Sequence, residues 1–169
     1  MSAVLTESLY HVELIDGREV EKPLPKKLHA FVQTYLINKL GRELPQQYRA
    51  VSELNVLTGG RTPEGRREYV VPDITVVERN AKYEDGDLAE PPIWDVEILS
   101  PGQTIGDLFV RAERLLKLGC PLVWVIWPEK QRAWEYSTDL EEQHTQLRVR
   151  LPNGETIAIP LSDIWAELT

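Results

Sequence analysis

The fold of this chain is decided by two apolar runs, Tyr69-Val70-Val71-Pro72-Asp73-Ile74-Thr75-Val76-Val77 and Pro92-Ile93-Trp94-Asp95-Val96-Glu97-Ile98-Leu99-Ser100-Pro101. Both are rich in β-branched and aromatic residues, which favour strands of a sheet covered on its faces. An ionised carboxylate in such a strand is costly unless a cation or a hydrogen-bond donor meets it. A divalent metal held by Asp73 and Glu97 would supply that partner. Taken singly, Asp73 could instead cap a turn, and Glu97 could form a structural ion pair with an arginine.

The segment after the second run predicts a helix and then a third strand. Apolar residues recur at helical spacing from Ile105 to Leu118, Thr104 is a suitable N-cap, and Gly119 is a natural residue to end the helix. The apolar run 121–128 predicts another buried strand. Strand, helix and strand at this spacing indicate a βαβ unit with parallel strands and a right-handed crossover. Ligands of open α/β sheets bind at the strand ends and helix starts of such units.

The remaining segments predict a scaffold around this unit. Asp16-Gly17 indicates a hairpin, and the apolar stripe of Pro25 to Leu44 indicates an amphipathic helix. Ser162 is expected to cap a short closing helix, and the acidic stretch 80–90 is expected to be a surface connection. Further strands are expected over 47–57, 132–137, 146–151 and 156–160. With no repeat or linker, residues 1–169 predict a single α/β domain.

Composition sets outer limits on location and chemistry. The 169 residues are 42% hydrophobic and 27% charged, which is typical of a globular protein. No apolar run approaches the ~20 residues that cross a bilayer, and the N-terminus lacks the pattern of a signal peptide. Cys120 is the only cysteine, which excludes an internal disulfide and a cysteine-rich zinc site. These features predict a cytoplasmic protein that does not bind membranes.

Net charge argues against avid binding of nucleic acid, but its distribution leaves room for it. The net charge is −8, whereas duplex binding usually rests on a basic surface. The negative excess lies in residues 81–169, with 8 basic and 16 acidic side chains. Two basic clusters in the other part could contact phosphates or could be solvated loop charges: Lys22, Lys26 and Lys27, and Arg61, Arg66 and Arg67.

Several short motifs in this order resemble the putative restriction endonuclease family of the PD-(D/E)XK nuclease superfamily. They are Pro72-Asp73, Glu97-Ile98-Leu99-Ser100-Pro101, and a helix ending at Gly119 before a Trp-bearing strand. Segments 10–17, 25–29 and 161–165 resemble that family's opening hairpin, entry into the first helix and closing segment. The resemblance spans nearly the whole chain. It implies a restriction endonuclease-like fold, with a mixed β-sheet flanked by helices and an N-terminal β-hairpin.

The resemblance also implies a metal site and a reaction. In that superfamily an Asp and a Glu bind Mg²⁺ or a similar ion such as Mn²⁺, and a backbone carbonyl beside the Glu completes the set. The matching ligands are Asp73, Glu97 and the carbonyl of Ile98, with Glu13 as a candidate acidic addition. The ion polarises the scissile phosphate and activates a water. The resemblance therefore implies a metal-dependent DNA endonuclease. If DNA is the substrate, the candidate contacts within the two basic clusters are Lys26, Lys27, Arg66 and Arg67.

The chain departs from the superfamily pattern at the lysine. The third motif position, two residues after Glu97, is Leu99. In the family the lysine is commonly found on the following helix, at the position that is Arg111 here. Arginine keeps the charge and can hold a phosphate with two donors, but it stays protonated and transfers no proton. We therefore expect Asp73, Glu97 and Arg111 to form the catalytic set, or the chain to be a non-catalytic descendant that binds DNA or protein. An unrelated phosphate binder is the weaker alternative because no Gly-rich loop follows a strand.

The tryptophans and strand edges bear on association. Tryptophans lie at positions 94, 124, 127, 134 and 165, mostly on expected strands. They predict core packing or an association surface in preference to base-stacking platforms. Exposed edge strands invite pairing, and superfamily nucleases that cut both strands often act as pairs. A homodimer is therefore expected.

Overall fold

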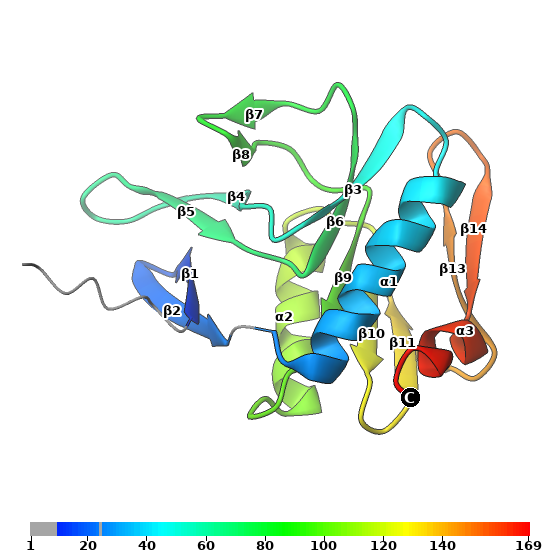
Figure 1. Ribbon diagram of the computed structural model, residues 1–169. Helices are drawn as coiled ribbons and strands as arrows, with labels where there is room; N and C mark the ends of the chain where they lie inside the picture. Colours follow the sequence, from blue (N-terminus) through cyan, green and yellow to red (C-terminus); the bar gives the residue numbers. More distant parts are fainter. Residues whose placement is uncertain (1–9, 24) are drawn as a thin grey trace, which may run out of the picture.

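A mixed central sheet organises the part of the chain that the computed structural model describes, residues 10–23 and 25–169 (Figure 1). Its strand order is β12-β11-β10-β9-β6-β3. β9 and β10 are parallel, and the other neighbours are antiparallel. The strands are β3 (Tyr48–Ser52), β6 (Ile74–Glu78), β9 (Trp94–Ile98), β10 (Val123–Trp127), β11 (Arg132–Tyr136) and β12 (Leu140–Gln143).

Two helices, α1 (Lys27–Glu43) and α2 (Ile105–Lys117), cover opposite faces of this sheet (Figure 1). The alternation of side chains along β10 shows the two faces, because successive residues of a strand point to opposite sides. Trp124 and Ile126 pack in the core beneath α1, whereas Val123 and Val125 pack against α2. Since α2 links β9 to the parallel β10, the predicted βαβ unit is confirmed, as is the mixed sheet flanked by helices.

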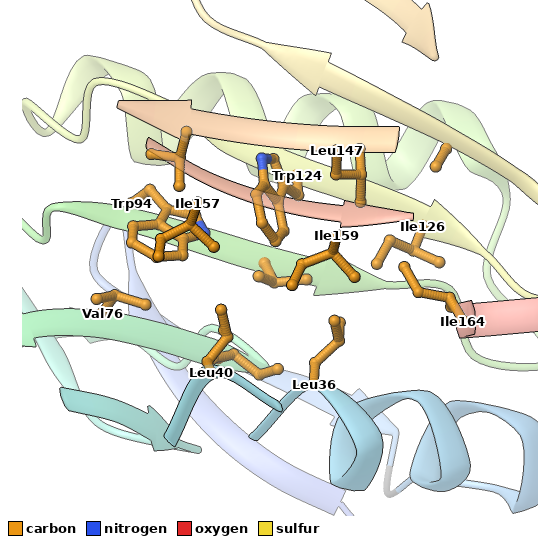
Figure 2. Packing of buried hydrophobic residues seen from close by; sticks show 14 of the residues in the cluster. Leu36, Leu40, Val76, Trp94, Trp124, Ile126, Leu147, Ile157, Ile159 and Ile164 are labelled. Atoms are coloured by element: carbon orange, nitrogen blue, oxygen red, sulfur yellow. The ribbon is translucent and has the colours of Figure 1, made fainter. Parts of the chain in front are cut away.

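The core beneath α1 is closed by a small antiparallel sheet and the last helix. These elements are β13 (Gln146–Arg150), β14 (Thr156–Pro160) and α3 (Leu161–Ala166). Figure 2 shows Leu36 and Leu40 of α1 facing Trp94 and Trp124 across this core. The two indole rings are fully buried, with their centroids 5.4 Å apart. They are therefore core residues, and they offer no surface for association.

A third sheet carries the N-terminal hairpin. The hairpin predicted at Asp16-Gly17 is confirmed, and its strand β1 joins β5 at Leu14 and Tyr69. The Glu68 carboxylate accepts the backbone N–H of Gly17 at 2.6 Å, which holds the hairpin tip. The strand order is β2-β1-β5-β4-β8-β7, with β1 (Tyr10–Ile15), β2 (Arg18–Pro23), β4 (Val56–Arg61), β5 (Arg67–Val70), β7 (Tyr83–Glu84) and β8 (Asp87–Leu88).

The prediction of continuous strands over 47–57 and 69–77 is wrong, since each range is broken into two strands. The first break holds Glu53, whose φ of +52° is uncommon for a residue with a side chain. The second break holds Pro72, which has no N–H to offer a ladder, and Asp73. The N–H of Glu53 donates to the carbonyl of Asp73 at 3.3 Å. Both breaks therefore bring an acidic residue to the same place.

Smaller differences concern the surface and the end of the chain. The stretch 80–90 contains the short strands β7 and β8, and β12 was not expected. Ser162 does not cap α3, which follows Pro160 and has no side-chain cap. No helix in the described part of the chain is long and apolar enough to cross a membrane.

Removal of the α2 cap tests the predicted start of this helix. Thr104 Oγ1 accepts the N–H of Asp107 at 3.1 Å, and the Asp107 carboxylate accepts the N–H of Thr104 at 3.0 Å. Thr104→Ala should therefore lower the free energy of unfolding by about 0.5–2 kcal/mol, measured by urea titration. The exposed Thr138 provides a control, because Thr138→Ala removes no cap. Equal losses in the two variants would show that the cap does not stabilise α2.

Candidate functional site

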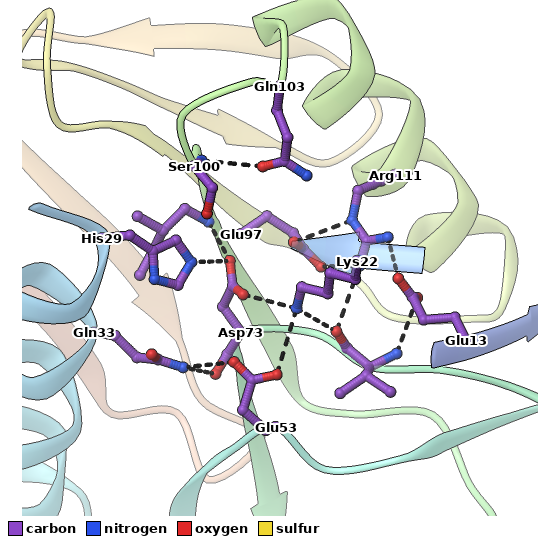
Figure 3. Close-up of polar contacts among 12 residues, drawn as sticks. Glu13, Lys22, His29, Gln33, Glu53, Asp73, Glu97, Ser100, Gln103 and Arg111 are labelled. Carbon is purple, nitrogen blue, oxygen red and sulfur yellow. Dashed lines mark hydrogen bonds and ion pairs between the residues drawn. The ribbon is translucent and has the colours of Figure 1, made fainter. Parts of the chain in front are cut away.

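The register of β6 and β9 places Asp73 beside Glu97. Ile74 pairs with Val96 in this antiparallel ladder, so the next position along brings Asp73 opposite Glu97. Val96 and Ile98 pack beneath α1, so Glu97 faces the α2 side of the sheet. Both carboxylates are about 1% exposed. The two acids predicted as a pair thus lie together at one end of the central sheet (Figure 3).

Asp73 is held from three directions. Its Oδ2 accepts the backbone N–H of Ile98 at 2.6 Å and lies 3.1 Å from His29 Nε2. Its Oδ1 lies 2.7 Å from Lys22 Nζ. Although burial raises the pKa of the Asp73 carboxyl, Lys22 and His29 hold that pKa well below its ordinary value. Asp73 is therefore an anion with the Lys22 cation already beside it.

Glu13 and Glu97 share one guanidinium. Arg111 donates from Nη1 to Glu13 Oε1, and its Nε lies 3.3 Å from Glu97 Oε2. The other oxygen of Glu13 accepts the N–H of Val71 at 3.1 Å. Burial raises the pKa of Glu97 to about 7, while Arg111 acts in the opposite direction. Arg111 itself stays charged, because Glu97 and Glu13 outweigh its burial and raise its pKa.

Lys22 is a member of this cluster that sequence reasoning missed. Its Nζ lies 2.6 Å from the carbonyl oxygen of Val71 and 3.6 Å from Glu53 Oε2, besides its contact with Asp73. Burial lowers its pKa, but Asp73 and the other carboxylates outweigh this and raise the pKa above its ordinary value. Lys22 had been grouped with Lys26 and Lys27 as a candidate phosphate contact. The structure places it inside the protein, as the one lysine among the buried residues that it describes.

Three further polar residues complete the cluster, two from α1 and one from the break between β3 and β4. His29 in the first turn of α1 faces Asp73. Gln33, one turn later, donates to Glu53 Oε1 at 3.0 Å and to the carbonyl of Asp73 at 2.8 Å. Glu53 arises at the β3–β4 break. Only His29 and Gln33 had a signal in the sequence, because residues four apart lie on the same face of a helix. The other contacts depend on the tertiary fold.

The four predicted nucleic-acid contacts lie in two different environments. Lys26 and Lys27 border a cavity of about 240 Å³ whose lining also includes His29, Leu99 and Ser100. This cavity adjoins the carboxylates through His29. Arg67 lies 2.8 Å from Glu84 and 2.5 Å from Asp85, and Arg66 lies 3.5 Å from Glu19. The lysines are thus placed beside the site, and the arginines are paired with acids on the hairpin sheet.

A further acid lies deeper on the same face. Asp95, two residues before Glu97 on β9, is fully buried opposite Thr75 of β6. Burial raises the pKa of Asp95 to about 7, although Thr75 acts against the shift. The α2 side of β9 therefore presents two carboxyl groups that are reluctant to ionise.

Comparisons with known proteins agree on a nuclease family. The family model described as "Putative restriction endonuclease" (Uma2) matches residues 3–169. A crystal structure from Anabaena variabilis, described as a putative nuclease belonging to DUF820, superposes with a TM-score of 0.75 at 27% identity. The alignment covers 98% of this chain and 95% of that one. No curated protein matches the chain.

The raised pKa of Asp95 predicts a particular dependence of stability on pH. Between its unfolded pKa of about 4 and the folded value, the folded chain binds a proton that the unfolded chain lacks, so stability falls as pH rises through this window. Asp95→Asn abolishes this component. The melting temperature of the variant relative to the natural chain should therefore be higher at pH 8 than at pH 5, by at least about 2–4 °C.

Calorimetry at both pH values checks this expectation. The exposed Asp139 provides the control variant Asp139→Asn. If the natural chain and Asp95→Asn differ equally at the two pH values, Asp95 does not carry the proton.

Proposed function

Because the chain belongs to the putative restriction endonuclease family, we propose that it is a metal-dependent DNA endonuclease that hydrolyses phosphodiester bonds by water attack. The observation that carries the proposal is the pairing of Asp73 with Glu97 at one end of the central sheet, with Glu13 reaching Glu97 through Arg111. Asp73, Glu97 and Glu13 are the acids that the resemblance assigns to the metal site, and their common position supports the proposal.

The donor set fits a divalent ion in its chemistry. Mg²⁺ and Mn²⁺ prefer carboxylate and carbonyl oxygens, and Asp73, Glu97, the carbonyl of Ile98 and Glu13 would hold the ion here. In the described residues, no three His, Cys, Asp or Glu side chains stand ready as a metal cluster. The buried oxygens Asp73 Oδ1 and Glu53 Oε2 accept no hydrogen bond in the described part of the chain, and Lys22 Nζ faces them at 2.7 and 3.6 Å. When bound, the ion would polarise the scissile phosphate and lower the pKa of the attacking water.

The protein's own residues orient this site and approach the DNA. Arg111 fixes Glu13 and Glu97 with separate donors, so it acts on the acids and stays protonated. Lys26 and Lys27 lie at the cavity beside His29, where they would contact the phosphates that flank the cleaved bond. Arg66 and Arg67 would contact DNA only by exchanging their acidic partners for phosphates.

A non-catalytic binding module is the second candidate, and one observation favours it. Asp73, Glu97 and Glu13 each already have a protein cation beside them, as in a purely structural ion network. Such a module would bind DNA or a protein on the same fold. In either case, the homodimer and the cytoplasmic location stay predictions.

Plasmid cleavage tests the proposed function. Supercoiled plasmid with Mg²⁺ or Mn²⁺ should be nicked or linearised, and EDTA should stop the reaction. Asp73→Asn and Glu97→Gln should each reduce the rate by at least about tenfold and weaken binding of the divalent ion, because each removes a formal charge from the ligands. Equal cleavage by the natural chain and Asp73→Asn would identify the activity as contamination. If no condition gives cleavage, the non-catalytic binding module is the candidate function that remains.

Substitution of Arg111 tests its role separately. Arg111→Lys should keep or raise cleavage because a cation stays between Glu13 and Glu97. Arg111→Ala should lower cleavage sharply and cost about 3–5 kcal/mol of stability, since it leaves two buried acids without their cation. The rate and a urea titration measure the two effects. Arg114→Ala, one turn away on an exposed face, is the control. An Arg111→Ala variant that cleaves as fast as the natural chain would contradict this role.

A further inference from the structure

We infer that the ammonium group of Lys22 occupies a cation position built by the body of the protein, so that a divalent ion can bind there when Lys22 is replaced. In the natural chain, Lys22 is therefore the cation that occupies the part of the site next to Asp73. The role of this lysine in DNA cleavage rests on the proposed function, whereas the existence of the cation position does not depend on it.

The first argument is the arrangement of oxygens around Lys22 Nζ. Three oxygens face it: Asp73 Oδ1 at 2.7 Å, the Val71 carbonyl at 2.6 Å and Glu53 Oε2 at 3.6 Å. Of these, the Val71 carbonyl accepts a hydrogen bond from the ammonium, and the carboxylates of Asp73 and Glu53 form ion pairs with it. Two carboxylates and a backbone carbonyl are also the oxygen types that bind Ca²⁺ and Mg²⁺. The two short contacts are close to the 2.3–2.6 Å of Ca²⁺–oxygen distances, which are longer than those of Mg²⁺.

The second argument is that the oxygens are held without Lys22. The Asp73 carboxylate accepts the N–H of Ile98 at 2.6 Å, and its carbonyl accepts both Gln33 and the N–H of Glu53. Gln33 also donates to the other oxygen of Glu53. The acceptors therefore lie at the two strand breaks and are held by donors from α1 and β9, while the cation comes from β2 of the hairpin (Figure 3).

Thermal unfolding in the presence and absence of divalent ions tests the inference. Lys22→Met keeps the length of the side chain but removes its charge, and in EDTA its melting temperature should fall by roughly 6–20 °C because Asp73 and Glu53 lose their cation. Addition of Ca²⁺, or of Mg²⁺ as a second probe, should restore much of this loss, since an ion that binds only the folded state stabilises it. The melting temperature of the natural chain should rise less on addition of Ca²⁺. The apparent affinity of the variant for Ca²⁺ should be at least about tenfold higher than that of the natural chain.

Two variants and one salt control distinguish Ca²⁺ binding at this position from a general effect of charge or ionic strength on stability. The exposed Lys117 gives the control Lys117→Met, which should behave like the natural chain. Lys22→Met combined with Glu53→Gln should lose part of the response to Ca²⁺, because one ligand charge is gone. NaCl at matched ionic strength should not reproduce the effect. Equal responses of Lys22→Met and the natural chain to Ca²⁺ would overturn the inference.

Failure to fold would also decide the question. If Lys22→Met is recovered only when refolded with Ca²⁺, the inference is supported. If recovery is the same with Ca²⁺ and with EDTA, the oxygens do not form a cation position. An inactive natural chain in the plasmid assay removes the proposed nuclease function but leaves the response of Lys22→Met to Ca²⁺ unaffected, so the two failures are distinguishable.

Discussion

Negative charge buried at one end of β6 and β9 must be balanced, and the surrounding elements are arranged around this requirement. Glu13, Asp73 and Glu97 are almost entirely buried, and a buried carboxylate without a cation costs several kcal/mol. Arg111 reaches this end from α2, and Lys22 reaches it from β2. The helix, the hairpin and the two broken strands thus meet where isolated charge would otherwise destabilise the fold.

Elements governed by local sequence were predictable. The start of α2 follows from the capping box of Thr104 and Asp107, and its end follows from Gly119, whose φ of +102° suits glycine. The hairpin turn at Asp16-Gly17 is likewise a local preference. The pairing of Asp73 with Glu97 could be expected because each is a carboxylate within an apolar run, and a buried carboxylate needs a partner that the two could share.

Contacts that depend on long-range docking were not predictable. Nothing near Lys22 in the sequence distinguishes it from Lys26 and Lys27, and only the docked hairpin buries it. The break at Glu53 has no glycine or proline to indicate it, and the contacts of its side chain with Gln33 and Lys22 depend on the tertiary fold. Apolar patterns also left the role of the tryptophans open. Burial of Trp94 and Trp124 against each other assigns these two to the core.

The N-terminal hairpin has an electrostatic property that follows from its two contributions. It brings one acid, Glu13, and one cation, Lys22, to the site. Docking of these two groups therefore changes which charges touch but leaves the net charge at the end of the sheet the same. At a distance the charges of Glu13 and Lys22 cancel, so this pair neither attracts nor repels an approaching polyanion, and its effect is confined to the groups that it touches.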